Sequence, residues 1–132
     1  FSIGTSSDTN PSSGTMIAYC FAEIAGYSKF GSYTGNGSSD GVFVYTGFRP
    51  KYVMTKSSTS ASNWAINDTS RSPYNVSNAT LLAENSIAES TSYPIDILSN
   101  GFKLRTTNQN DNGQTFIYMA FSENPFKNAL AR

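Results

Sequence analysis

Residues 26–50, Gly26-Tyr-Ser-Lys-Phe-Gly-Ser-Tyr-Thr-Gly-Asn-Gly-Ser-Ser-Asp-Gly-Val-Phe-Val-Tyr-Thr-Gly-Phe-Arg-Pro50, alternate strand-forming blocks with glycine-rich turns. An aromatic-rich run is followed at 34–41 by Gly, Asn and Asp, which tolerate the positive φ angles of turns and exposed loops. β-branched and aromatic residues return at 42–46, and the strand pattern resumes at 51–56 after a corner that ends in proline. The stretch predicts a rigid β-scaffold that displays loops.

Two further segments have the pattern of strands that are covered on both sides. In residues 15–23 one alternating set holds Ile17, Tyr19 and Phe21, and the other set holds Met and small apolar residues. Residues 115–122 show the same two apolar faces, so we expect both segments to be central strands and natural partners of each other. A sheet covered on its second face by another subunit, as in trimeric fibres, also fits this pattern.

The clearest hairpin signal lies at 93–106, where Asn100-Gly101 separates two strand patterns and accommodates the positive φ angles of a type I′ turn. We expect Phe102 and Leu104 to face the core. About eight to ten short strands with little helical periodicity predict an all-β fold, an antiparallel β-sandwich of the jelly-roll type. A further strand is expected at 62–67, and 79–85 has the pattern of either one helical turn or a strand, of which a strand is favoured.

Length and composition narrow the class of protein. The 132 residues predict one domain, and we expect residues 1–14 to be a lead-in segment or linker and residues 15–132 to be a single β-sandwich domain. Nine basic and nine acidic residues give a net charge of zero, so we expect neither nucleic acid nor membrane insertion. Cys20, the one cysteine, lies in an apolar run and is predicted to be a buried free thiol.

The residue types exclude several kinds of chemistry. The chain has no histidine, which removes the Ser-His-Asp and Cys-His arrangements and most zinc sites. The glycine-rich stretch at 31–41 lacks the Lys-Ser/Thr and the helix of a phosphate-binding loop, so it is read as a turn. We therefore expect no enzyme activity and no cofactor.

Carboxylate side chains are candidates for two further kinds of site, a glycoside-hydrolysing site and a calcium site. Glycoside hydrolysis needs a carboxylate pair, and calcium needs several oxygen ligands from one or more loops. Nothing in the sequence brings two of the candidate hydrolysis carboxylates together. Turn formation explains the loop aspartates that could bind calcium, so we expect no metal site. The hydrolysis candidates are Glu23, Glu84, Glu89, Asp96 and Glu123, and the calcium candidates are Asp8, Asp40, Asp68 and Asp111.

Five motifs in a fixed order carry a family resemblance over nearly the whole chain. They are Ile17-Ala-Tyr-Cys-Phe-Ala-Glu23, Gly26-Tyr-Ser-Lys-Phe-Gly-Ser-Tyr-Thr-Gly-Asn-Gly37, Phe43-Val-Tyr-Thr-Gly-Phe-Arg-Pro50, Leu98-Ser-Asn-Gly-Phe-Lys-Leu-Arg105 and Ile117-Tyr-Met-Ala-Phe-Ser-Glu-Asn-Pro-Phe126. On these motifs the chain resembles an uncharacterised domain family found in tail-fibre-like and other virion-associated proteins of marine bacteriophages. The resemblance implies a virion location and a domain at the C-terminal part of a larger protein, ending in the tail at 125–132.

Sugar recognition uses aromatic faces beside Asn, Asp and Ser hydrogen-bonding groups. The candidate ligand-binding residues are Trp64, Tyr74, Asn36 and Asp68, and the other aromatics near loops are Tyr27, Tyr33 and Tyr93. The expected binding loops are 34–41, 57–63, 68–78 and 107–114.

Together with the resemblance, these residues indicate a tail-fibre-like virion module that binds a bacterial-surface glycan or protein. The expected partners are other virion proteins and further copies of the chain, as a homo-oligomer with a trimer favoured. The first alternative is a purely structural subunit that decorates a capsid or builds a fibre. The second is a glycan-degrading enzyme.

Overall fold

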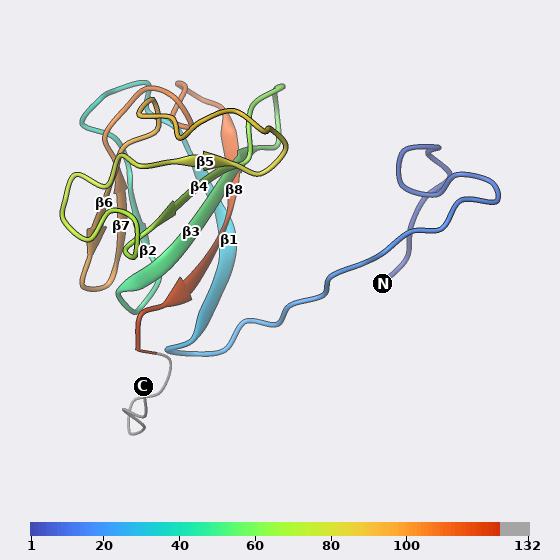
Figure 1. Ribbon diagram of the computed structural model, residues 1–132, viewed down its shortest axis with the longest axis horizontal. Coiled ribbons are helices and arrows are strands. Elements are labelled where there is room, and N and C mark those ends of the chain that lie inside the picture. The colour runs from blue at the N-terminus through green and yellow to red at the C-terminus, as the bar shows by residue number, and fades with distance from the viewer. Residues whose placement is uncertain (125–132) are drawn as a thin grey trace.

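The computed structural model describes residues 1–124, and two antiparallel sheets face each other in it (Figure 1). The first sheet has five strands in the order β1-β8-β3-β4-β5, and the second has three in the order β2-β7-β6. This arrangement confirms the predicted all-β sandwich. The strands are β1 (Ser28–Thr34), β2 (Phe43–Tyr45), β3 (Pro50–Ser57), β4 (Ala65–Asp68), β5 (Leu81–Leu82), β6 (Ile95–Leu98), β7 (Gly101–Leu104) and β8 (Thr115–Ser122). The predicted tail at 125–132 lies outside the described residues.

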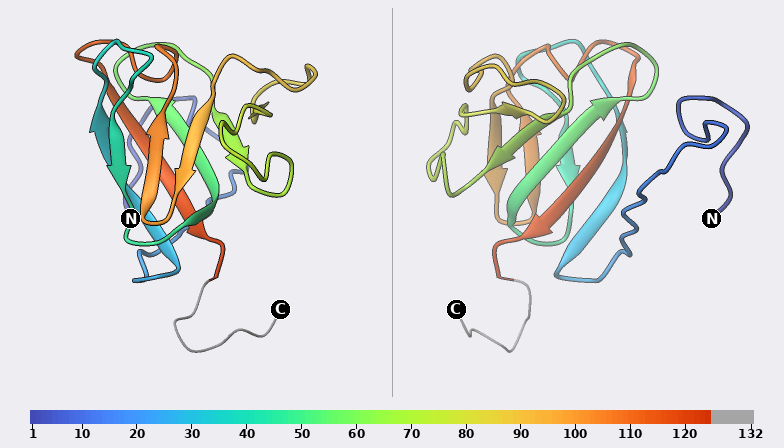
Figure 2. Two further views of the ribbon diagram at one scale, coloured as in Figure 1. Left: turned by 90° about the vertical axis from the view of Figure 1, so that its left-hand side faces the viewer. Right: turned by 45° about the vertical axis from the view of Figure 1, so that its right-hand side comes forward.

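Buried residues of both sheets form the core between the two layers, and Figure 2 shows these layers facing each other. From β8, alternate residues Phe116, Tyr118 and Ala120 point inward, and from the second sheet Phe102 and Leu104 meet them. Phe102 and Leu104 are at most 1 % exposed, which confirms the prediction that they face the core. Alternation along each strand therefore buries one face of each sheet in the shared core.

The opposite face of the five-stranded sheet is also apolar, and we call it the outer face. Its residues alternate with the core residues along β1, β3 and β8 and are partly or largely exposed. Residues 115–122 thus form a central strand, as predicted, but only one of its two apolar faces is buried in the core. The outer face consists of Phe30, Tyr52, Met54, Ile117, Met119 and Phe121.

The β6–β7 hairpin confirms the strand pair predicted at 93–106, with Leu98 opposite Gly101. Its turn is not of the predicted type I′, because neither Asn100 nor Gly101 has a positive φ. Gly101 is required for a different reason: a Cβ at this position would lie 2.1 Å from the carbonyl oxygen of Val44. The glycine lets β2 approach β7 closely.

Residues 15–23, which we call the arm, form no strand, so the prediction of a central strand that pairs with 115–122 is wrong. β8 pairs instead with β1 and β3. The arm leads away from the sandwich and is exposed along its length (Figure 1). Cys20 is exposed with it, contrary to the predicted buried thiol. Among the strands of residues 1–124 none pairs with the arm, so its apolar alternation alone does not make it a strand.

The corner at Gly47–Pro50 carries the chain from one layer to the other. β2 pairs with β7 in the three-stranded sheet, whereas β3 pairs with β4 and β8 in the five-stranded sheet.

Residues 1–124 contain no helix of the length and apolar character that crossing a bilayer requires.

Candidate functional site

Three of the four expected binding loops meet at one end of the sandwich, which we call the loop end. Loop 34–41 contacts loop 107–114 in two ways: the backbone nitrogen of Gly37 donates to the carbonyl of Asn110, and the side-chain amide of Asn110 donates to Oδ1 of Asn36. Loop 57–63 contacts the same loop because the hydroxyl of Ser60 donates to Oε1 of Gln114 at 2.6 Å. These loops lie together at the top of the molecule in Figure 2.

Asn110 fixes the geometry of the loop end from inside. Its side chain is fully buried, and its amide nitrogen donates to Oδ1 of Asn36 and to the carbonyl of Ser38, each at 2.7 Å. Its Oδ1 accepts from the backbone nitrogen of Asn36 at 3.2 Å. Gly35 lies so close that a Cβ there would be 2.3 Å from the carbonyl oxygen of Asp111. The backbone of loops 34–41 and 107–114 is therefore held in place, and so are the positions from which their exposed side chains project.

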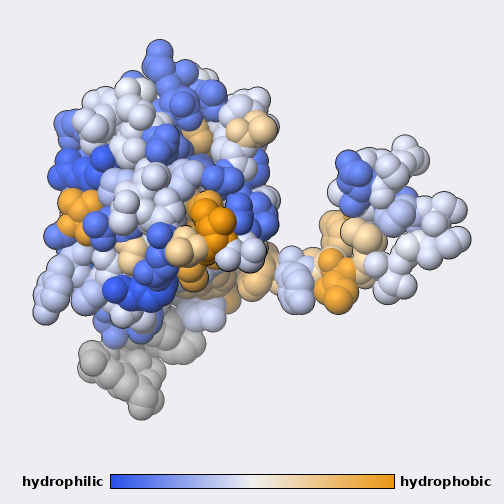
Figure 3. All heavy atoms as spheres, turned by 45° about the horizontal axis from the view of Figure 1, so that its top comes forward, coloured by the Kyte–Doolittle hydropathy of each residue, from blue (hydrophilic) through white to orange (hydrophobic). Residues whose placement is uncertain are grey.

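A polar hollow of about 490 Å³ opens at the loop end. Its walls come from loop 57–63, from loop 107–114 and from Tyr93, two residues before β6. In Figure 3 the surface toward the loop end is mostly hydrophilic. The lining residues are Ala61, Ser62, Asn63, Tyr93, Asn108, Gln109 and Asp111.

Hydrogen bonds hold the polar walls of this hollow in fixed positions. Nδ2 of Asn63 donates to the hydroxyl of Tyr93 at 2.7 Å, and Nε2 of Gln109 donates to the carbonyl of Asn63 at 2.8 Å. Asn108 donates to the carbonyl of Ser92 at 2.9 Å. The Tyr93 ring and three amide side chains are thus oriented before any ligand arrives.

Gln109 has an unsatisfied acceptor at this wall. The residue is 4 % exposed and has a φ of 59°, a left-handed conformation that is uncommon outside glycine. Within residues 1–124 no group donates a hydrogen bond to its Oε1. A buried acceptor without a donor is unfavourable, so a hydroxyl donor that reaches it from the hollow would be stabilised.

Two of the predicted ligand-binding residues hold loops in place. Oδ1 of Asn36 accepts from Asn110 and from the backbone of Ser38. Oδ1 of Asp68 accepts from the backbone nitrogens of Ser70 and Arg71, and its Oδ2 accepts from Nε of Arg71 at 2.6 Å. Burial alone would raise the pKa of Asp68, but these hydrogen bonds and the Arg71 charge outweigh it and lower the pKa.

The other two predicted residues lie away from the loop end. Trp64 sits beside the outer face, where it lines a second hollow with Met54 and Met119, and Nζ of Lys56 lies 6.0 Å from its ring. Tyr74 is 83 % exposed on loop 68–78, which runs along β6 and not to the loop end. None of the four predicted residues lines the polar hollow.

Sequence reasoning found the loops of the hollow but not its residues. Loops 57–63 and 107–114 were expected to bind, and Tyr93 belonged to the wider set of aromatics. Asn63, Asn108 and Gln109 were missed, because a chain rich in Asn and Ser gives no local signal for the few amides that converge. Only the long-range pairing of the loops selects them.

The five carboxylates that are candidates for glycoside hydrolysis each form an ion pair or hydrogen bond with a different residue. Glu23 pairs with Lys29 at 2.6 Å, Glu89 with Arg71 at 2.8 Å, and Glu123 with Arg49 at 2.8 Å. Glu84 accepts from the backbone of Trp64, and Asp96 accepts from Arg105. Residues 1–124 contain no group of three or more Cys, Asp or Glu side chains that could hold a metal ion.

Comparison with known proteins gives one match. The sequence model of a family described as a domain of unknown function, DUF7483, matches residues 1–125. No curated protein and no solved structure matches the chain.

Proposed function

Since the chain belongs to the family of domains of unknown function DUF7483, we propose its function from its surfaces and from its resemblance to virion-associated domains. It is a tail-fibre-like appendage module of a bacteriophage virion. It has a structural role in the particle and binds a bacterial-surface glycan or protein through the loop end. It acts by binding and not by catalysis.

The polar hollow is the observation that supports this proposal. Its lining combines one aromatic ring, Tyr93, with the amides of Asn63, Asn108 and Gln109 and the carboxylate of Asp111. A sugar ring offers an apolar face that packs on an aromatic side chain and hydroxyls that both donate and accept. Asn and Gln amides match such hydroxyls in both directions, and the unsatisfied Oε1 of Gln109 calls for a donor.

The openness of the hollow indicates weak binding by each copy. Asn108 and Asp111 are exposed, so a ligand here keeps part of its surface in water. Several copies on one particle would make weak contacts effective, because tethering raises the effective concentration of the second and later sites. A repetitive bacterial-surface polysaccharide is the ligand class that offers many equal sites to such an array.

Binding without hydrolysis is supported by the distribution of carboxylates. Of the residues that line the hollow, Asp111 alone carries a carboxyl group. Hydrolysis of a glycosidic bond ordinarily uses two carboxyl groups about 5 to 9.5 Å apart. The five carboxylates considered above are each engaged elsewhere, with partners on separate parts of the sandwich.

An array of purified bacterial-surface polysaccharides tests the binding role. The full chain is expected to bind at least one of them. Asn108→Ala and Asp111→Ala are each expected to weaken that binding about tenfold, because each removes a polar group at the wall of the hollow. Tyr74→Ala is the matched control, since Tyr74 is exposed but lies outside the hollow. Equal loss with Tyr74→Ala, or no loss with the two hollow variants, would place any binding elsewhere.

The purely structural role is the second candidate, and the apolar outer face favours it. A subunit that builds a fibre or decorates a capsid needs a surface that other virion proteins cover. Imaging of particles that carry a label on this domain separates the two roles. Loop ends that are free and distal support adhesion, and loop ends buried against neighbouring proteins support the structural role.

The glycan-degrading alternative has its own test. The protein is incubated with each polysaccharide that it binds, and the length distribution of the polysaccharide is measured before and after the incubation. Shortened chains would establish hydrolysis and contradict the proposal, whereas unchanged lengths support binding alone.

A further inference from the structure

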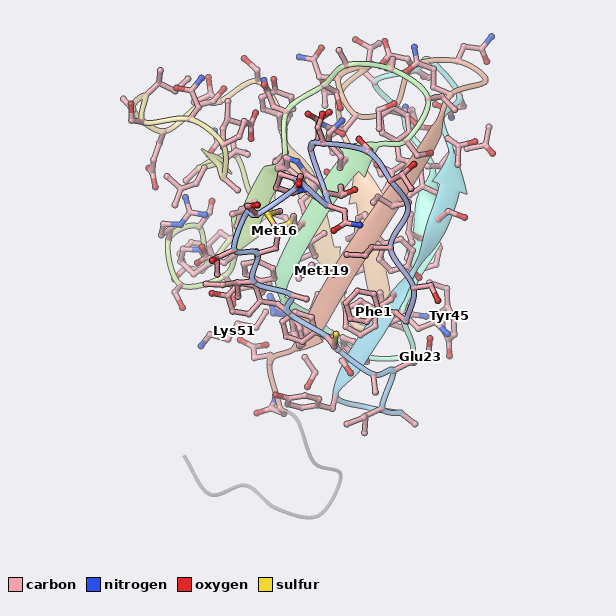
Figure 4. The ribbon with its side chains drawn as sticks, turned by 90° about the vertical axis from the view of Figure 1, so that its right-hand side faces the viewer. Phe1, Met16, Glu23, Tyr45, Lys51 and Met119 are labelled. Carbon is pink, nitrogen blue, oxygen red and sulfur yellow. The ribbon has the colours of Figure 1, made fainter. Side chains whose placement is uncertain are left out.

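The outer face is an apolar surface with two hollows. One hollow, of about 340 Å³, is lined by residues that include Phe30, Trp64 and Ile117, and the other, of about 460 Å³, by residues that include Tyr52 and Phe121. Met54 and Met119 line both. Figure 4 looks onto this face, with Met119 near the middle of the sheet. The two hollows are therefore neighbouring parts of one apolar surface.

The arm is the second apolar surface without a cover. Seven of the fifteen large apolar side chains that are exposed within residues 1–124 precede Gly26. In the arm these are Met16, Ile17, Tyr19 and Phe21, with exposed fractions of 53, 76, 81 and 58 %. Figure 3 shows apolar residues on the arm as well as on the adjoining side of the sandwich. So much exposed apolar side chain marks an interaction surface.

The arm already touches the outer face at one corner. The ring of Phe21 lies 6.0 Å from that of Phe30 and 5.7 Å from that of Phe121, between ring centroids. Tyr19 and Phe21 line the 460 Å³ hollow together with residues of the outer face. The arm is anchored at its base, where Ile24 bridges to Ser28 and Glu23 pairs with Lys29. Tyr19 and Phe21, which belong to one alternating set of arm residues, thus lie against the sheet of their own chain.

The other set, Met16, Ala18 and Cys20, is exposed, and nothing within residues 1–124 covers it. A segment with two apolar sides exposes one of them to water unless both sides are covered, and exposed apolar surface of this kind marks an interaction site. The outer face of the same chain can bury one side only. From this we infer that the outer faces of two copies of this chain pack toward each other, with residues 15–21 of each arm held between them. The occupant of the outer face is therefore a second copy of this chain.

The length of the arm suits this arrangement. Residues 15–21 in an extended conformation span about 23 Å, at about 3.3 Å per residue. Five strands at a spacing of about 4.8 Å are about 19 Å from the first to the last. An arm can therefore cross the whole outer face. This inference does not depend on the ligand of the loop end, and it leaves that end exposed on each copy.

Sedimentation velocity over a range of concentrations tests the inference with the full chain. We expect a mass of at least twice 14.3 kDa, and we expect Met119→Glu and Ile17→Glu each to shift it to 14.3 kDa. Ile87→Glu is the matched control, because Ile87 is 56 % exposed on the segment between β5 and β6 and should leave the mass unchanged. A monomer at every concentration, or an oligomer that survives Ile17→Glu, overturns the proposal.

Ile17→Glu keeps this test valid even if Met119→Glu impairs folding, because Ile17 is 76 % exposed and makes no part of the core. Far-UV circular dichroism of each variant checks that the sheets are intact.

A disulfide distinguishes an arm on its own sheet from an arm shared between copies. Cys20 is the one cysteine in the chain, so Met119→Cys provides a single new partner for it. After mild oxidation, we expect a disulfide between two chains that disappears in the Cys20→Ser/Met119→Cys variant. A disulfide within one chain, or none in a preparation that sediments as an oligomer, contradicts the shared arm.

Discussion

The buried side chain of Asn110 donates a hydrogen bond of 2.7 Å to Oδ1 of Asn36, which lies 74 residues earlier in the chain. This contact joins the loop after β1 to the loop before β8, two strands that are themselves neighbours in the five-stranded sheet. The ladder of β1 and β8 brings the two loops together, and Asn110 then fixes their relative position. The order of the loop end therefore depends on a polar residue in the interior.

Asn110→Ala is expected to destabilise the fold by about 1–3 kcal/mol, because it leaves the buried groups that Asn110 bonds without partners. Urea unfolding followed by tryptophan fluorescence measures the change. Asn112→Ala, two residues away and exposed, is the control and should stay within about 0.5 kcal/mol of the parent chain. Equal stability of the two variants would show that Asn110 does not hold the loops.

Gly101→Ala is expected to lower the stability by about 3 kcal/mol, near the upper end of overpacking costs. The added Cβ would lie 2.1 Å from the carbonyl oxygen of Val44, and only a shift of β2 away from β7 could relieve this contact. Thermal unfolding measures the loss. Gly4→Ala serves as control, since no atom lies within 4 Å of a Cβ at that position. An unchanged midpoint for Gly101→Ala would mean that β2 gives way at no cost.

The strands that sequence reasoning located correctly are those whose partners lie within one chain. The β6–β7 hairpin is local, and the alternation in β8 is satisfied by the core on one side. The arm failed for the opposite reason. Its apolar alternation predicted a strand, but a strand also needs a neighbour to pair with, and within residues 1–124 no strand pairs with residues 15–23.

The candidate site was predictable at the level of loops and not of side chains. Glycine and asparagine mark where the chain turns, so the loops could be placed. Asn36 and Asp68 look like ligand groups in the sequence, yet both satisfy backbone nitrogens nearby. Which polar side chains remain free to meet a ligand depends on hydrogen bonds across 16 to 46 residues, such as those from Asn108 to Ser92 and from Gln109 to Asn63.

Asp68→Asn is expected to reduce the stability at pH 7 by about 1–2 kcal/mol, because the amide accepts more weakly from Arg71 than the carboxylate does. The pKa of Asp68 in the folded chain lies below its ordinary value of 3.8. Its stabilising effect is therefore complete above about pH 4 and is lost as the pH falls through the lowered pKa. The difference between parent and variant in urea midpoint should narrow toward pH 2.5, and a constant difference would exclude this role for the charge.

Tyr33→Phe tests the alkaline side. Its hydroxyl donates to the carbonyl of Gln109 at 2.7 Å, so its removal is expected to cost about 1 kcal/mol at neutral pH. Burial raises the pKa of Tyr33 far above its ordinary value of 10.0, even though a hydrogen bond with Thr55 lowers it in part. In the unfolded chain Tyr33 ionises near pH 10, which favours unfolding of the parent chain above that pH.

The phenylalanine variant lacks this ionisation, and the other tyrosines with raised pKa values, Tyr52 and Tyr118, are present in both proteins and cancel in the difference. The stability advantage of the parent chain should therefore shrink between pH 10 and pH 11.5, as measured by urea unfolding. An advantage that stays constant over this range would show that the Tyr33 hydroxyl is accessible enough to ionise in the folded state. In that case the contact between β1 and loop 107–114 would open without unfolding, and the wall of the hollow formed by Gln109 would not be fixed in advance of binding.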